Sequence, residues 1–204
     1  MATWELAGKA RSDFADMIEP LTPEQLQEQS LCTAWTAQGV LAHVTSFVET
    51  GAFGFVGALA KSGFNFDKGS IIMADQQLER PVSDVLASLR KNAAKSAPMP
   101  GFPEAMTVSD VAIHTQDVRR PLALPGTLDE AVLQQALDFL TTDKKATTLV
   151  DRRPLDGVRL VATESDWSFG EGAEITGTSE AIMMGLANRP VLDELSGEGL
   201  AICR

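Results

Sequence analysis

Cysteine is scarce in this sequence, with two residues among 204. Cys32 and Cys203 stand in neither a metal-binding nor a dithiol spacing, which argues against a disulfide scaffold and a redox pair. Cys32 lies in a loop just before a predicted helix. Because a helix N-terminus favours the reactive thiolate, a nucleophilic role for Cys32 stays open beside the plainer interpretation of a small loop residue.

Basic residues are also few. The 17 lysines and arginines are outnumbered by 28 aspartates and glutamates, which gives a formal net charge of -11 at pH 7 and a pI of about 4.6. A protein that binds DNA or RNA needs a concentrated basic face to neutralise phosphates. The composition therefore predicts no nucleic-acid partner.

Long uninterrupted apolar runs are also missing from this sequence. The first residues, MATWELAGKARSDF, lack the apolar core of a signal peptide, and we find no stretch near the roughly 20 apolar residues that span a bilayer. With 44% hydrophobic and 22% charged residues, the composition is that of an ordinary globular protein with one large or two small cores. We expect a soluble cytoplasmic protein, monomeric or weakly oligomeric, with no membrane partner.

Apolar residues recur at helical spacing in four segments of the first 120 residues. The helices expected there cover residues 3–19, 36–60, 82–97 and 107–120. Thr22 before Pro23 predicts a short capped turn, and Thr36 is the expected cap of the second helix. Residues 61–81 contain glycine and show no period, so we expect a loop that lines or covers a site. Four helices with polar residues on interior stripes predict a bundle with a site between facing helices.

The pattern changes after Pro121, Pro125 and Gly126, which marks a domain boundary within residues 121–127. We place the helical bundle at residues 1–122 and a second domain at 123–204. The second domain begins with an amphipathic helix over residues 128–143. Short alternating runs joined by glycine turns and a further helix over 179–189 follow, which predicts a small α+β unit.

The chain contains two histidines. His43 shares the apolar stripe of its helix, so its side chain is expected to face the core. His114 follows Asp110 by four residues, which puts both side chains on one helix face. Two imidazoles and one carboxylate form a candidate divalent-metal site of the open, catalytic kind. Two histidines that are merely buried in the core remain the alternative, and Asp110 could instead close a capping box with Thr107 at the helix start.

Three further polar residues stand on the same helix as His114. Asp117, one turn beyond, could be an additional ligand, an acceptor that orients the imidazole, or a solvated carboxylate. Arg119 and Arg120 close the helix, where cations complement the macrodipole whatever the function. A sharper interpretation is that one of them clamps a carboxylate of an anionic small-molecule substrate, because guanidinium pairs with carboxylate bidentately. Trp35 is expected to be a packing residue.

Two stretches of this sequence resemble the mycothiol-dependent maleylpyruvate isomerase family, which belongs to the DinB-like metal-binding four-helix bundles. They are LTPEQLQEQSLCTAWTAQGVLAHV and MTVSDVAIHTQDVRRPLALP, and the C-terminal GVRLVATESDWSFGEGAEITGTSEAIMMGLANR is similar to a small sterol-carrier-like α+β domain. The resemblance implies that His43, Asp110 and His114 match three metal ligands, usually for zinc. The matching acid of the maleylpyruvate isomerases proper is a glutamate, one methylene longer than Asp110.

The resemblance also implies a metal- and thiol-dependent enzyme that uses mycothiol or a similar thiol. A metal ion stabilises a thiolate near neutral pH, and the thiolate then serves an isomerase of the maleylpyruvate type or a thiol S-transferase. Asp117, Arg119 and Arg120 are the candidate catalytic residues. Two alternatives remain: a metallohydrolase in which Asp117 is the general base, and an apolar-ligand-binding protein whose bundle is only structural.

Overall fold

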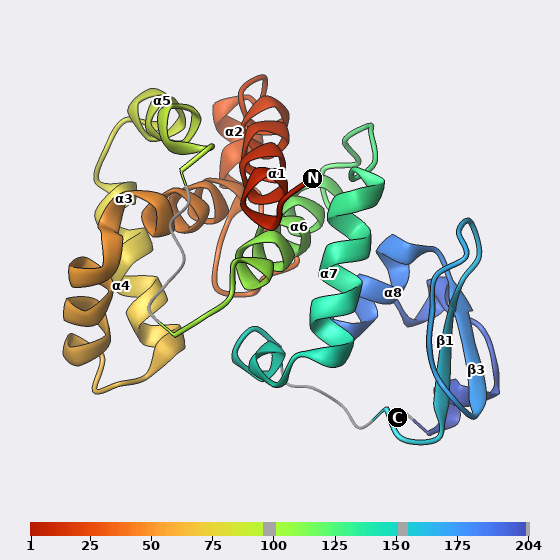
Figure 1. Cartoon of the computed structure of the whole chain (residues 1–204). Helices are drawn as coiled ribbons and strands as arrows, with labels where there is room; N and C mark the ends of the chain where they lie inside the picture. The colour runs from red at the N-terminus through yellow and green to blue at the C-terminus, as the bar shows by residue number, and fades with distance from the viewer. Residues whose placement is uncertain (96–100, 151–154, 203–204) are drawn as a thin grey trace. The chain divides into compact units, whose positions relative to one another are not determined.

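A computed structural model of the chain describes residues 1–95, 101–150 and 155–202, so Cys203 lies outside the described residues. The chain divides into two compact units, Met1–Gly126 and Thr127–Arg204. Helices make up the first unit, and the second adds a small three-stranded sheet (Figure 1). The predicted fold class, a helical bundle followed by an α+β domain, is confirmed.

The described part of the first unit contains the helices that were predicted and one that was not. They are α1 (Thr3–Ile18), α2 (Pro23–Gln27), α3 (Ala37–Lys61), α4 (Phe66–Leu78), α5 (Val82–Asn92) and α6 (Glu104–Arg119). Helix α3 packs against α4 and α5, and α1 packs against α6. The buried core consists mainly of alanine, valine and leucine side chains from these helices.

Side-chain caps fix where two of the predicted elements begin. The Thr22 hydroxyl accepts a hydrogen bond from the Gln25 amide, and the Gln25 side chain accepts one from the Thr22 amide. The Thr36 hydroxyl accepts a hydrogen bond from the amide of Gly39 at the start of α3. Each cap supplies an acceptor for an N–H group that has no partner within the helix. Both predicted caps are therefore confirmed.

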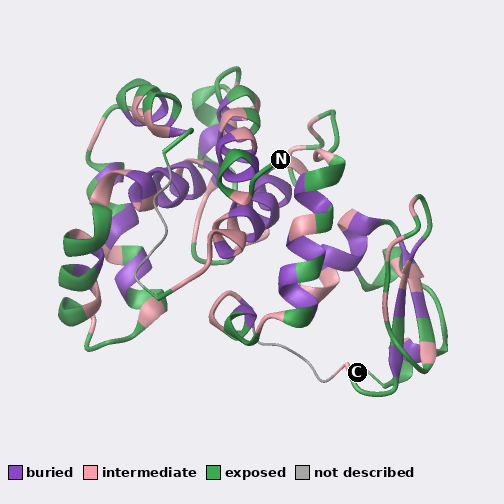
Figure 2. Cartoon of the chain, in the orientation of Figure 1, coloured by how far each residue is buried: buried purple, intermediate pink, exposed green. Residues whose placement is uncertain are grey.

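Helix α3 is the longest helix described, with 25 residues, and it is broken at Gly51, whose φ of 61° is non-helical. Residues before the break are mostly buried, whereas exposed residues dominate the second half (Figure 2). Contrary to expectation, this described helix is long and apolar enough to span a bilayer, by length and composition alone. Over half of its most apolar stretch, 56%, is buried inside the protein, as in the core helix of a bundle.

The prediction of a loop over residues 61–81 is wrong, because α4 occupies most of that segment. The Asn65 side chain caps α4 by accepting a hydrogen bond from the Lys68 amide. Its buried face consists largely of small and polar residues: Gly69, Ser70, Met73, Ala74 and Gln77. Such a face carries almost no apolar periodicity, so the hydrophobic pattern could not indicate the helix.

Helix α6 begins one turn earlier than predicted, at Glu104, after Pro103. Asp110 therefore lies inside the helix and cannot cap its start, so the capping-box interpretation of Thr107 and Asp110 is wrong. All residues from Val108 to Val118 are buried except Asp110, which is intermediate. Helix α6 is thus a central helix surrounded by protein on nearly every side.

The second unit combines helices with a small sheet, as the sequence predicted. Its elements are α7 (Glu130–Thr142), η1 (Lys144–Thr148), β1 (Val158–Ala162), β2 (Ser168–Gly170), β3 (Ala173–Gly177), α8 (Ser179–Leu186), η2 (Leu192–Glu194) and η3 (Glu198–Ala201). Strand β1 is central, antiparallel to β2 and parallel to β3. Helices α7 and α8 pack together, and the described core of this unit lies between them and the sheet.

Candidate metal centre

His43 lies on the first half of α3 with only 3% of its surface exposed. The Trp35 ring stacks on its imidazole, with a centroid distance of 4.2 Å and an interplanar angle of 28°. Phe47 meets the same imidazole edge-on at 4.9 Å and 90°. On the ring edge, Nδ1 lies 3.0 Å from the hydroxyl of Ser70, a buried residue of α4. The ring is thus held on both its face and its edge.

Asp110 and His114 lie on one face of α6, as their spacing predicts. The Asp110 carboxylate stands between the two imidazoles: Oδ2 is 3.4 Å from His43 Nε2, and Oδ1 is 3.6 Å from His114 Nε2. One candidate ligand atom from each residue lies within 4.8 Å of the other two. The Asp110 side chain is 16% exposed, more than either imidazole. The structure therefore brings together the three predicted ligands, which come from two helices.

Asp117 contacts the other edge of the His114 ring. Its Oδ2 lies 2.8 Å from His114 Nδ1, and the Asp117 side chain has no exposed surface. An ionised carboxylate can only accept, so His114 Nδ1 must donate the proton of this hydrogen bond. The neutral form of His114 then carries its lone pair on Nε2, the atom that faces Asp110. This is the arrangement that orients a metal-binding histidine.

Burial and charge set the ionisation of the cluster. Burial lowers the pKa of His43 below its usual 6.5, so the imidazole is neutral at neutral pH, although the nearby Asp110 opposes this shift. Burial alone would raise the pKa of Asp110, but His43, His114 and the Arg11 guanidinium bring that pKa below its usual 3.8. The cluster at neutral pH is therefore a carboxylate next to a neutral His43.

The donor set fits a divalent cation. The two imidazole Nε2 atoms and the carboxylate oxygens converge, and all of them offer lone pairs when both rings are neutral and carry their protons on Nδ1. His43 Nε2 is buried and makes no hydrogen bond to any described residue. A buried acceptor without a donor is costly, and either an additional proton or a metal ion at the centre would satisfy it. Two nitrogens and one carboxylate are a ligand set of catalytic zinc sites, with a position left open.

Arg119 is the last residue of α6 and Arg120 is its C-cap, and both are partly buried. The Arg120 Nε donates a hydrogen bond to the Gln116 side chain at 3.2 Å. The Arg119 guanidinium lies beside Gly126, in the loop that follows the helix. Arg119 is five residues beyond His114, about 7.5 Å along the helix axis. A role for either arginine in holding a substrate carboxylate stays a prediction.

Trp35 and Cys32 lie closer to the cluster than the sequence indicated. Trp35 stacks on His43 and also meets the His114 ring edge-on at 5.5 Å, so its packing role is inside the site. The Cys32 thiol, a His114 nitrogen and an Asp117 oxygen lie within 4.8 Å of one another. No sequence pattern predicted these contacts, because the loop before α3 reaches the α6 helix only in the folded chain.

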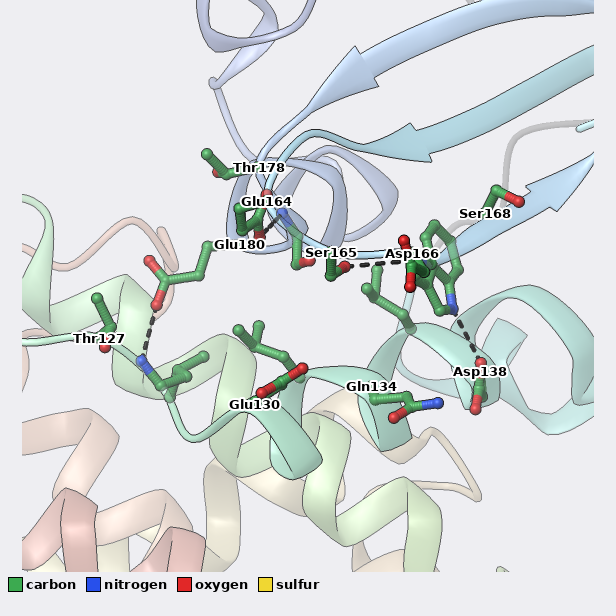
Figure 3. Close-up of a pocket in the computed structure, with 15 residues that line it drawn as sticks. Thr127, Glu130, Gln134, Asp138, Glu164, Ser165, Asp166, Ser168, Thr178 and Glu180 are labelled. Atoms are coloured by element: carbon green, nitrogen blue, oxygen red, sulfur yellow. Dashed lines mark hydrogen bonds between the residues drawn. The ribbon is translucent and has the colours of Figure 1, made fainter.

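The second unit contains a separate cavity of about 940 Å³ (Figure 3). The described residues that line it include no lysine or arginine but five acids: Glu130, Asp138, Glu164, Asp166 and Glu180. Three of the five accept hydrogen bonds that fix the cavity wall. Asp138 accepts from the Trp167 indole at 3.0 Å, Glu164 from the Ser179 amide at 2.7 Å, and Glu180 from the Leu128 amide at 2.8 Å. The cavity is therefore polar and acidic.

The fold and the cluster of two imidazoles and a carboxylate place the chain among helical-bundle proteins with a candidate metal centre. A family model described as the mycothiol maleylpyruvate isomerase N-terminal domain matches residues 7–119. The match covers more than half of the 204 residues, and the chain belongs to this family. The predicted family resemblance is therefore confirmed.

Two solved structures share the fold. The crystal structure of the mycothiol-dependent maleylpyruvate isomerase has a TM-score of 0.55 and 15% sequence identity, and the match covers 96% of this chain and 91% of that one. A histidine-to-alanine mutant of such an isomerase has a TM-score of 0.56 and 14% identity over the same shares of both chains. Comparison with curated proteins gave no significant match.

Proposed function

We propose that this chain is an enzyme that holds one divalent metal ion, zinc, with His43, Asp110 and His114, and uses it with mycothiol as a thiol cosubstrate. One observation carries the proposal: both Nε2 atoms lie within 3.4–3.6 Å of the two oxygens of one carboxylate. Family membership supports the choice of thiol and of an isomerase reaction.

The bound ion would lower the pKa of a thiol beside it, so that the nucleophilic thiolate is available near neutral pH. In an isomerase of the maleylpyruvate type, the thiolate sulfur forms a bond to one carbon of a cis double bond. The substrate then rotates about the resulting single bond, and the carbon–sulfur bond breaks to leave the trans product and the thiolate. In a thiol S-transferase the carbon–sulfur bond would remain.

The chain's own residues orient the ligands and the substrate. Asp117 keeps the proton of His114 on Nδ1 and so keeps the Nε2 lone pair toward the centre. Its buried position suits an orienting role better than direct contact with substrate. Arg119 or Arg120 would bind a carboxylate of an anionic substrate, which favours a small carboxylic acid. Trp35 and Phe47 cover His43 and exclude water from its ring.

The apolar-ligand alternative has less support. The apolar space found among the described residues of the second unit is about 50 Å³, and Leu140, Leu160 and Ile182 are among its lining residues. Pockets that hold small molecules are usually about 300–1,000 Å³. The larger cavity of that unit is acidic, which is unsuited to a sterol or fatty acid.

Metal analysis tests the metal half of the proposal. The purified chain should carry about one zinc ion, and His43→Ala and Asp110→Asn should each lose it. Asp75→Asn is the matched control, because Asp75 is an exposed carboxylate on α4 outside the cluster. Equal zinc content in all four proteins would show that the cluster is not a metal site.

A thiol-dependence assay tests the reaction. Zinc-loaded protein would be incubated with maleylpyruvate and with a panel of electrophiles, with and without mycothiol. Isomerisation that requires mycothiol supports the isomerase, and stable thiol adducts support the transferase. Hydrolysis that proceeds equally without the thiol would instead favour the metallohydrolase and overturn the thiol mechanism.

A further inference from the structure

Ser70 stands out among the contacts of the cluster, because it comes from a helix that supplies no candidate ligand. Its hydroxyl lies 3.0 Å from His43 Nδ1, and Ser70 is 4% exposed. Helix α4 also packs closely against the second half of α3: a methyl group on the neighbouring Gly69 would lie 3.6 Å from the Leu59 backbone. The hydroxyl is therefore held against the imidazole by helix packing.

An imidazole has two orientations that fill nearly the same space, because rotation by 180° about Cβ–Cγ exchanges Nδ1 with Cδ2 and Nε2 with Cε1. Trp35 stacks on the face of the His43 ring, and a face contact is nearly the same in both orientations. A hydrogen bond at Nδ1 distinguishes them. Only the orientation with Nδ1 toward Ser70 aims Nε2 at Asp110.

We propose that Ser70 is a positioning residue, whose hydroxyl accepts the Nδ1–H of His43 and thereby holds the Nε2 lone pair toward the metal centre. This inference rests on the proposed metal site. Ser70 does for His43 what Asp117 does for His114, with a neutral acceptor in place of a carboxylate. The two imidazoles are thus oriented by unlike partners, and α4 contributes to the site without touching the ion.

The chain offers a closely matched control for this role. Ser46 is also buried and also bonds to His43, but its hydroxyl donates to the His43 main-chain carbonyl at 2.7 Å. Ser46→Ala and Ser70→Ala therefore remove the same group at similar burial. Ser46→Ala removes a contact to the backbone of His43, whereas Ser70→Ala removes the contact to its ring.

The experiment measures the zinc dissociation constant by competition with a chromophoric chelator. We expect Ser70→Ala to weaken zinc binding by about tenfold, at the low end of the range for residues that orient ligands, and Ser46→Ala to change it by less than about twofold. Ser70→Thr keeps the hydroxyl and should restore most of the affinity. Equal affinities for wild type and Ser70→Ala would overturn the positioning role while leaving the metal site intact.

A second measurement does not depend on whether the variants fold well. The chain has two histidines, so the ring signals of a ¹⁵N-labelled sample can be assigned by comparison with His43→Ala. Zinc-loaded wild type should show His43 with a slowly exchanging proton on Nδ1. A His43 bound through Nδ1, or lacking that proton, would overturn the proposal. If wild type binds no zinc at all, the metal site itself fails, and the role of Ser70 fails with it.

Discussion

Asp117→Asn provides the sharpest test of how the α6 cluster works. The substitution preserves shape but replaces one carboxylate oxygen with an NH₂ group. An asparagine amide can donate to His114 Nδ1, and His114 would then carry its proton on Nε2, where it faces Asp110. That proton occupies the lone pair that a metal ion needs. We therefore expect zinc binding to weaken although Asp117 touches no ion.

The structure sets the size of the effect. The hydrogen bond from His114 Nδ1 to Asp117 Oδ2 is 2.8 Å long and fully buried, and its acceptor is charged. Hydrogen bonds to charged groups contribute about 1.5–3 kcal/mol. Since about 1.4 kcal/mol corresponds to a factor of ten, the zinc dissociation constant should rise roughly 10- to 150-fold. The loss of zinc affinity should exceed the loss caused by Ser70→Ala, because the Ser70 hydroxyl is a neutral acceptor.

Chelator competition at constant pH measures this change, and activity at saturating zinc separates the two roles considered for Asp117. If Asp117 only orients His114, added zinc should restore much of the activity of Asp117→Asn. If Asp117 transfers a proton to substrate, zinc affinity should stay normal while activity is lost at any zinc concentration. A dissociation constant within about threefold of wild type would refute the orienting role.

Three further predictions concern pH and stability. Because burial lowers the pKa of His43 below 6.5, protons compete with zinc for its Nε2 only at lower pH. Zinc should therefore stay bound at pH 6.5 and be released on further acidification, which a zinc-sensitive dye can follow. Buried Arg11, whose pKa burial lowers to about 10, donates two hydrogen bonds to carbonyls just after α5. Arg11→Ala should reduce the free energy of unfolding in urea by about 3 kcal/mol, whereas removing the partly exposed Lys9 side chain should change it by less than about 0.5 kcal/mol. Gly172 has a φ of 125°, and a methyl group there would overlap the Gly157 carbonyl. Gly172→Ala should therefore lower the melting temperature of the second unit, and an unchanged melting curve would contradict this.

Local patterns explain why part of the site could be predicted from the sequence. The four-residue spacing of Asp110 and His114 guarantees one helix face, and a helix is a short-range structure. The apolar stripe around His43 indicated that its side chain faces inward. The packing of a bundle and the family resemblance indicate that the two inward helix faces meet. No spacing within the chain indicates this.

The parts that were missed depend on contacts between distant segments. Ser70 belongs to a helix whose buried face includes glycine, alanine and two polar side chains, so no apolar stripe indicated that it faces inward. Trp35 is in a loop, where no periodicity exists to show which way a side chain points. Both residues reach His43 only once α3, α4 and the preceding loop have packed together. Sequence reasoning could indicate the ligands and Asp117, which shares a helix with His114, but not the residues from other segments that contact His43.

Helix α6 shows why polar residues inside a bundle are better evidence of a site than apolar ones. Its fully buried stretch from Val111 to Val118 includes Thr115 and Gln116 as well as His114 and Asp117. Burying each polar group costs free energy unless a partner satisfies it, and apolar side chains of similar size would stabilise the bundle at least as well. The fold alone therefore gives no reason for an imidazole and a carboxylate at these positions. Their pairing at 2.8 Å, with the Nε2 edge of the imidazole aimed at a second carboxylate, is what a metal site requires and what a hydrophobic core does not.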